Sequence, residues 1–285
     1  MVERISARVV VLASALMLTG GTAGAADDGK YPDLRGQWSR VVIRGLGGQG
    51  TFDQTKPWGP GQQAPLTAEY QKVLEDSMAE QAQGGLGNYP TARCMPSGMP
   101  RMMTFGMQEW VVTPETTYIL LGGEDHYRRI FTDGRDWPEE IDPSYGGYSI
   151  GRWVDEDGDG RYDVLEVETR GFKGPRAYDA TGLPLHFDNQ SIFKERVYLD
   201  KSDRSILHDQ ITVIDHALTR PWTVDKRYRR DPSARPKWPE SYCTEGNAQI
   251  AVGKENYFLS GDGYLMPARK DQPPPDARYF KQTRK

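Results

Sequence analysis

The sequence predicts a mainly β protein, an antiparallel and closed or nearly closed barrel of eight to ten strands with one or two peripheral helices. Two observations lead to this fold class. From Met102 onward, short runs of β-branched and aromatic residues alternate with turn signals such as Asp133-Gly134. The chain of 285 residues also contains 15 Tyr and 7 Trp beside 31 Gly and 20 Pro, which is typical of short strands joined by frequent turns.

Residues 1–26 are predicted to be a secretory signal peptide. Arg4 and Arg8 give a positive start, residues 9–18 form a short apolar run, and small residues at 23–26 supply a cleavage site. The apolar run is too short to cross a bilayer, and no later stretch is long enough for a membrane helix. We therefore expect a periplasmic or secreted protein without a transmembrane segment. The sequence does not indicate an oligomeric state.

The barrel domain is expected over residues 27–245, beginning with a strand at Asp33–Ile43. Its Gly36-Gln37-Trp38 also resembles the Gly-x-Trp signature of lipocalin-type barrels. A peripheral helix near 67–83 follows, with Thr67 as its N-cap. One apolar stripe is expected to pack this helix against the sheet. Its residues are Leu66, Tyr70, Val73, Leu74 and Met78.

Alternation and turn signals predict eight further strands. They are Met102–Val112, Thr117–Leu121, Tyr127–Thr132, Tyr148–Val154, Val164–Gly171, Ile192–Leu199, Ile206–Ile214 and Val224–Arg229. Residues 246–285 are expected to form an irregular tail. The formal net charge is −4 with acids and bases interspersed, so no basic face for nucleic acid is expected.

The chain contains two cysteines, Cys94 and Cys243. Two thiols in an exported chain favour one disulfide, which would close a loop of about 150 residues and contribute on the order of 4–5 kcal/mol in the chain-entropy model. Two free thiols, or one reactive nucleophile, are the alternatives. Neither cysteine lies in a signature for catalysis.

Several segments taken together resemble a family of exported bacterial proteins with a lipocalin-like β-barrel, most of them labelled hypothetical. The segments are Ala92–Arg101, His126–Trp153, Arg220–Arg230 and Tyr242–Asn247. The resemblance implies a barrel, export and a Cys94–Cys243 disulfide, but no established activity. Where similar proteins turn through a short polar hairpin after Gly151-Arg152-Trp153, this chain has a longer acidic loop.

That loop, DEDGDGRYDVLE at 155–166, has the ligand spacing of an EF-hand calcium loop. The predicted ligands, of which Arg161 would offer its backbone carbonyl, are Asp155, Asp157, Asp159, Arg161, Asp163 and Glu166. The flanking residues indicate a hairpin instead of two helices. We therefore expect Ca²⁺ to stabilise the hairpin rather than to act in catalysis. The alternative is a solvated Asp/Gly-rich turn.

The strand containing HYRRIF at 126–131 must place an arginine inside the barrel, because Arg128 and Arg129 face opposite sides. A buried arginine needs a carboxylate or an anionic ligand. The expected internal partners are Glu109, Glu168, Glu195 and Asp215. Either an arginine contacts a ligand carboxylate or phenolate with His126 as acid/base, or it belongs to a satisfied network closing one end of the barrel.

The candidate proton-transfer set is His126, Arg128, His186 and Asp215. The candidate ligand-binding residues are Arg129, Trp153, Trp222 and Glu195. Tryptophans in such positions are more often core than ligand contacts. No histidine has the spacing of a metal pair, and His208 is expected to be solvated near a turn.

Three functions fit these residues. The first is a barrel that binds a small apolar or aromatic molecule. The second is a lyase- or isomerase-type enzyme that uses His and Arg or a carboxylate for proton transfer on the same barrel. The third is a structural envelope protein with a filled interior. An apolar pocket with one polar anchor favours the first, a histidine beside an arginine near an open mouth, with a raised or coupled pKa, favours the second, and an interior filled by large side chains favours the third.

Overall fold

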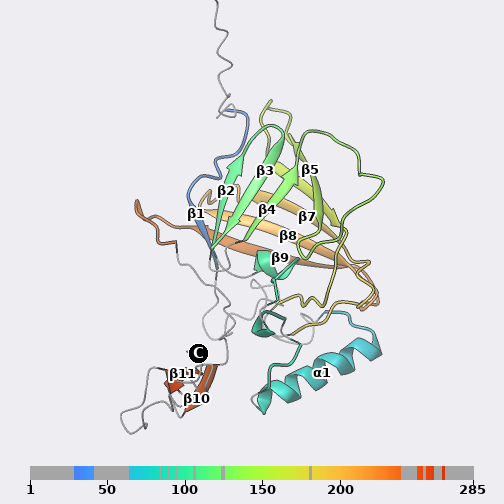
Figure 1. Ribbon diagram of the computed structural model, residues 1–285. Helices are drawn as coiled ribbons and strands as arrows, with labels where there is room; N and C mark the ends of the chain where they lie inside the picture. Colours follow the sequence, from blue (N-terminus) through green and yellow to red (C-terminus); the bar gives the residue numbers. More distant parts are fainter. Residues whose placement is uncertain are drawn as a thin grey trace, which may run out of the picture.

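The structure, a computed structural model, describes residues 29–41, 64–83, 85–88, 90–93, 95–104, 107–122, 126–179, 182–238, 249–252, 255–259 and 265–266. Within these residues, nine strands close into a barrel in chain order (Figure 1). The strands are β1 Gln37–Arg40, β2 Met107–Val112, β3 Thr116–Leu121, β4 His126–Phe131, β5 Tyr148–Val154, β6 Val164–Arg170, β7 Ile192–Leu199, β8 Ile206–Ile214 and β9 Trp222–Arg230. The predicted mainly β barrel of eight to ten strands is confirmed.

One strand pair departs from the antiparallel prediction. β4 and β5 are parallel, and their register joins Ile130 to Ser149 and Phe131 to Ile150. Parallel neighbours need a longer connection than a hairpin, and residues 132–147 supply it. Every other neighbouring pair in the barrel is antiparallel. The barrel is therefore mixed, and the parallel pair is its shortest ladder.

The prediction of a strand beginning at Met102 was wrong. A short helix, α2 (Arg101–Thr104), occupies this position, and β2 starts at Met107. Pro100 precedes the helix, where a proline fits because the first turn needs no backbone donor. Met99, Met102 and Met103 are buried in the hydrophobic core, so unbranched thioethers fill space that a straight strand would not reach.

The peripheral helix is confirmed as α1 (Ala68–Ala82), and the Thr67 side chain accepts a hydrogen bond from the Tyr70 N–H. Its buried line differs from the predicted stripe. Tyr70 and Ser77 are buried, whereas Val73 and Met78 are exposed. The Ser77 hydroxyl accepts the Asn88 N–H at 2.8 Å, so the helix is held by the chain that follows it as well as by apolar packing.

Apolar side chains from alternate strand positions fill most of the barrel interior. The core includes Trp38, Trp110, Ile119, Leu165, Phe193, Leu207, Ile211 and Val224. Loop residues Tyr178, Leu183 and Leu185 join the same cluster near α1. This packed core rigidly positions the few polar side chains that also point inward.

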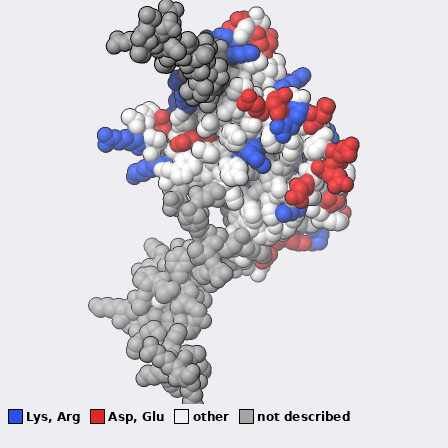
Figure 2. Space-filling model, turned by 45° about the horizontal axis from the view of Figure 1, so that its top comes forward, with Lys and Arg blue, Asp and Glu red and all other residues white. Residues whose placement is uncertain are grey.

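Three shorter elements complete the described residues. A 3₁₀-helix, η2 (Pro90–Arg93), lies between α1 and α2. The interval expected to be an irregular tail contains strands β10 (Gln249–Val252), β11 (Glu255–Leu259) and β12 (Leu265–Met266), which form a separate antiparallel sheet. On the face shown in Figure 2, described Lys and Arg side chains are mixed with Asp and Glu.

Among the described residues, no helix combines the length and apolar character required to cross a membrane.

Candidate functional site

The short ladder between β4 and β5 is the most weakly paired part of the closed barrel wall. β5 pairs with β4 only at Ile130 and Phe131, so residues 126–129 have no β5 partner in the ladder. The connection between the two strands turns past this stretch at Ser144–Gly147. A pocket of about 330 Å³ lies here, at the lower end of the range for small-molecule sites, roughly 300–1,000 Å³.

The walls of this pocket, which we call the β4–β5 pocket, combine aromatic and cationic groups. Its aromatic lining comes from Tyr127, Phe131, Tyr145 and Tyr148. Its polar lining includes three residues singled out from the sequence, namely His126, Arg128 and Arg129. His126 and both arginines of the predicted strand therefore lie at one pocket.

Arg128 points into the barrel and is the buried arginine expected from the strand pattern. It forms a bidentate ion pair with Glu195 on β7, with Nη1 donating to Oε1 at 2.8 Å. It also donates to Thr169 at 2.8 Å and to Ser149 at 3.3 Å. Burial opposes its charge, but attraction and hydrogen bonding to Glu195 outweigh burial and raise the pKa of Arg128. Of the expected partners, Glu195 is the one used, so the network alternative describes Arg128.

Arg129 differs from its neighbour because it faces outward. Its side chain is exposed, and its guanidinium carbon lies 5.6 Å from the centroid of the Phe131 ring. In the part of the chain that the structure describes, no carboxylate forms an ion pair with Arg129. The pocket therefore has one cation whose charge is compensated, Arg128, and one whose charge is available to a ligand.

A second inward-facing acid, Asp209, was not singled out from the sequence. It lies on β8 directly opposite Lys226 on β9, and both side chains are fully buried. Neither carboxyl oxygen of Asp209 has a hydrogen-bond partner among the described residues. Burial, followed by the nearby charge of Glu195, raises the pKa of Asp209 well above its ordinary value. Burial thus disfavours the charged form of Asp209, although Arg128 and Lys226 act in the opposite direction.

The other predicted proton-transfer residues do not line the β4–β5 pocket. His186 lies in the loop before β7, where its ring is 5.2 Å from that of Tyr70 on α1. Asp215 follows β8 and accepts the His186 N–H at 2.9 Å, the Ala217 N–H at 2.8 Å and the Ser191 hydroxyl. The carboxylate of Asp215 therefore holds loops together. The sequence-predicted set of His126, Arg128, His186 and Asp215 is not assembled as one site.

The predicted tryptophan contacts lie outside this pocket as well. Trp153 donates to the Thr117 hydroxyl at 3.3 Å and packs edge-on against Tyr31. Trp222 is buried, with its ring 4.9 Å from that of Tyr178. Both therefore serve as core and rim packing, which is the more common role of tryptophan.

The acidic loop brings together some of its predicted ligands. Carboxylate oxygens of Asp155, Asp157 and Asp159 lie within 4.8 Å of one another. Asp155 accepts the N–H groups of Gly158 at 2.7 Å and Gly160 at 2.9 Å, which fixes a tight turn.

The remaining predicted ligands of this loop are placed differently. The carboxylate of Asp163 accepts the Glu156 N–H at 3.0 Å, and the Arg161 N–H donates to Asp159 at 2.8 Å. Glu166 is on β6, where the Arg152 Nε donates to it at 2.8 Å. It is not among the grouped carboxylates. The loop therefore has the first part of the predicted ligand set, without its closing glutamate.

A larger groove of about 610 Å³ runs along the outer face of β5–β9. Its charged residues largely pair with one another. Arg152 binds Glu166, and Lys194 lies 3.5 Å from Glu168. Because these charges are compensated and exposed, the groove offers a ligand fewer available charges than the β4–β5 pocket.

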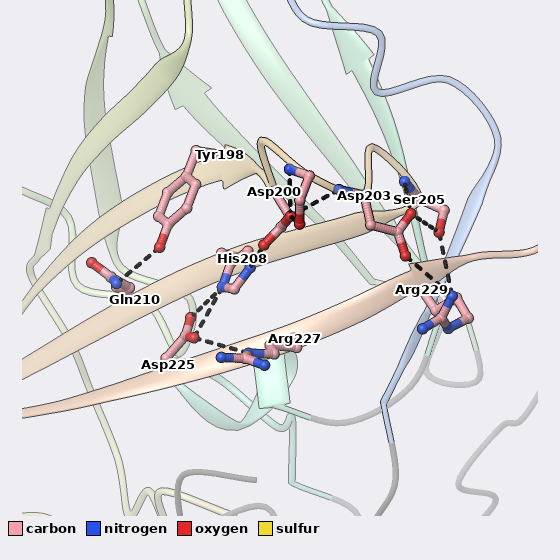
Figure 3. A network of polar contacts seen from close by, with 10 residues as sticks. Tyr198, Asp200, Asp203, Ser205, His208, Gln210, Asp225, Arg227 and Arg229 are labelled. Carbon is pink, nitrogen blue, oxygen red and sulfur yellow. Dashed lines mark hydrogen bonds and ion pairs between the residues drawn. The ribbon is translucent and has the colours of Figure 1, made fainter. Parts of the chain in front are cut away.

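His208 is the residue for which the expectation of a solvated side chain was wrong. It is 5% exposed and sits between two carboxylates, with Nδ1 2.9 Å from Asp225 and Nε2 3.3 Å from Asp200 (Figure 3). The ring also stacks on Tyr198, with 4.8 Å between the centroids. Hydrogen bonding to Asp225 raises the pKa of His208. His208 faces outward from the barrel, but neighbouring polar side chains bury it.

No family model matches the chain, and neither a curated protein nor a solved structure shows significant similarity to it.

Proposed function

We propose that this protein binds a small aromatic molecule carrying a carboxylate or phenolate in the β4–β5 pocket. The observation that carries the proposal is the pocket beside the short β4–β5 ladder, which is lined by four aromatic rings and Arg129. The rings Tyr127, Phe131, Tyr145 and Tyr148 offer stacking partners. Arg129 offers a charge that is not compensated among the described residues and can bind an anionic group bidentately.

The existing ion pair supports this division of roles. Because Glu195 neutralises Arg128, the inner arginine can keep the pocket floor in place without requiring an anion. The outer arginine and His126 remain at the mouth. We prefer binding to the proton-transfer alternative because His186 and Asp215, which the predicted proton-transfer set places with His126, lie at other contacts.

Calorimetric titration of the mature protein with benzoate, 4-hydroxybenzoate and cinnamate tests the proposal, with benzamide and benzyl alcohol as neutral comparisons. Arg129→Gln should weaken binding of the acids by about 10- to 100-fold, since a hydrogen bond to a charged group contributes roughly 1.5–3 kcal/mol. It should leave the neutral comparisons nearly unchanged. Arg204→Gln, which removes the same charge from an exposed turn, is the matched control.

Two results would overturn the proposal. One is that no aromatic acid binds or shifts the unfolding midpoint of the wild-type protein. The other is that Arg129→Gln and Arg204→Gln change acid binding equally, which would show that the effect is one of net charge alone.

We further propose that the acidic loop binds Ca²⁺ through the three grouped carboxylates of Asp155, Asp157 and Asp159, and that the ion stabilises the β5–β6 hairpin. Oxygen donors around a tight glycine turn suit calcium. The position of Glu166 on Arg152 does not fit a bidentate closing ligand, so water would complete the coordination.

Terbium is a suitable probe of this loop, because Tyr162 and Trp153 lie beside it and can sensitise its luminescence. We expect Ca²⁺ to compete with the terbium signal. Asp157→Asn should reduce the signal strongly, and Glu166→Gln should leave it unchanged. Absence of a signal would contradict calcium binding, and equal loss in both variants would show that Glu166 is a ligand after all.

Export and the Cys94–Cys243 disulfide remain proposals, because Met1–Ala26 and both cysteines lie outside the described residues. They are supported by the charged, apolar and small-residue segments of the N-terminus and by the even number of cysteines. Intact mass and N-terminal sequencing of the secreted protein, with and without reductant, would detect cleavage after the small residues at 23–26 and the loss of two hydrogens.

A further inference from the structure

The loop before β7 and the turn after β8 are fixed against each other near α1. Asp215, itself buried, accepts the His186 N–H from the loop and the Ala217 N–H from the turn. The Tyr70 hydroxyl of α1 accepts the Phe187 N–H at 3.3 Å. Helix α1, the loop before β7 and the turn after β8 are therefore held together at one place on the surface, although they are distant in sequence.

Three metal-ligating side chains converge at this point. The Nδ1 atom of His186 lies 3.0 Å from one carboxylate oxygen of Asp188, and the Nδ1 atom of His216 lies 2.6 Å from the other. The two imidazole rings are 5.5 Å apart and nearly perpendicular. Ligand atoms of all three residues lie within 4.8 Å of one another. No contact in this group involves the β4–β5 pocket or the acidic loop.

The same three side chains can also form a hydrogen-bonded His–Asp–His chain. The backbone N–H of Asp188 donates to Nδ1 of His186 at 3.2 Å, so a metal bound at this nitrogen would replace that hydrogen bond. The donor set itself, two imidazoles and one carboxylate held close together by fixed loops, is that of a metal site.

We propose that His186, Asp188 and His216 form a binding site for a divalent transition-metal ion of the Zn²⁺ class. Two imidazoles and one carboxylate are donors that Zn²⁺ and neighbouring first-row ions accept, whereas Ca²⁺ prefers oxygen alone. The His216 side chain is 68% exposed, so solvent can reach the remaining coordination positions. A metal with three protein ligands and open positions can polarise a bound water or small anion.

The site has a second consequence for the fold. Binding would cross-link the loop that carries His186 and Asp188 to the turn that carries His216, next to the contact already made by Asp215. The metal would bind the folded protein more tightly than the unfolded chain. Adding the metal should therefore raise the unfolding midpoint.

Calorimetric titration of the chelator-treated mature protein with Zn²⁺, together with the visible absorption of the Co²⁺-loaded protein, tests the inference. We expect binding in the micromolar range or tighter and a Co²⁺ spectrum typical of nitrogen and oxygen ligands. His216→Gln should weaken binding by at least about 10-fold, because replacing even a residue that merely supports a ligand typically costs 10- to 100-fold. Because the His216 side chain is exposed, this variant should fold as the wild-type protein does.

The matched control is Glu69→Gln, which removes a carboxylate of α1 near Tyr70 but outside the cluster. It should retain both the affinity and the Co²⁺ spectrum. Asp188→Asn, checked for folding by circular dichroism, should lose the spectrum together with the metal-dependent rise in unfolding midpoint. The inference is overturned if wild-type protein binds no transition metal, or if His216→Gln binds it as tightly as the Glu69→Gln control.

Discussion

Arg128 of β4 and Glu195 of β7 form a two-pronged ion pair inside the barrel, across the two strands that separate them. Ser149 on β5 and Thr169 on β6 also contact the guanidinium, so four consecutive strands contribute to one network. The network links Arg128 in the lining of the β4–β5 pocket to β7, three strands away around the barrel. Its charges are buried and satisfied, which makes it sensitive to removal of one partner.

Glu195→Gln should lower the free energy of unfolding by roughly 3–5 kcal/mol, because it leaves the Arg128 charge buried without a carboxylate. The double variant Arg128→Met with Glu195→Leu should lose less than the single variant, since neither charge then remains. Urea denaturation of both measures the difference. A double variant that loses as much stability as Glu195→Gln, or more, would contradict this account.

The buried Asp209 should make stability fall as pH rises. Its pKa is raised in the folded protein mainly by burial, so the folded state holds a proton that the unfolded chain releases above about pH 4. Stability is therefore lost from that pH upward to the folded pKa. Asp209→Asn removes this dependence, and its free energy of unfolding should exceed that of wild type by an amount that grows with pH. Parallel curves for the two proteins would show that Asp209 titrates normally.

His208 is a base and not an acid, but its contribution to stability should also fall as pH rises. Asp225 raises its pKa in the folded state, so the stabilisation is fully present below the unfolded value of about 6.5 and is lost as pH rises through the folded pKa. Wild type should therefore exceed His208→Gln in unfolding midpoint most at about pH 5–6 and least in alkaline solution. A difference independent of pH would indicate that packing on Tyr198, and not the charge, determines the contribution.

Two adjacent glycines in the pocket wall should respond differently to alanine. Gly147 has φ +71°, and an added Cβ would lie 2.5 Å from Phe172 and 2.8 Å from the Arg170 carbonyl oxygen. At Gly146, the nearest atom to an added Cβ would be the Met102 sulfur at 3.9 Å. Gly147→Ala should lower stability by at least about 1 kcal/mol and weaken ligand binding, whereas Gly146→Ala should be nearly neutral. Thermal unfolding and titration of both variants provide the comparison.

Periodicity predicted most of the barrel because inward and outward residues alternate along each strand. The same rule placed one of Arg128 and Arg129 inside, and Arg128 proved to be the inner residue. It also indicates that Asp209 and Lys226 point inward between apolar neighbours, a signal that the sequence interpretation overlooked. Periodicity does not predict which residues on different strands become partners. The choice of Glu195 as the partner of Arg128, and the parallel β4–β5 contact, depend on which strands become neighbours.

Local sequence was a weaker guide to the residues of the two proposed metal sites. His186 and Asp188 are two positions apart, but His216 joins them only because the loop before β7 folds back on the turn after β8. In the acidic loop, spacing correctly grouped Asp155, Asp157 and Asp159, since a tight turn brings nearby side chains together. It misplaced Glu166, because a strand continues after the loop and directs that carboxylate to Arg152.

The length of the hydrogen-bonded ladders varies around the barrel. β7 and β8 are joined along their whole length, whereas β4 and β5 meet only at Ile130 and Phe131. Thermal fluctuations should part the cylinder first along this seam, where few hydrogen bonds must break. Such an opening would give the ligand proposed for the β4–β5 pocket a route through the side of the barrel, and neither end of the barrel would have to widen to admit it.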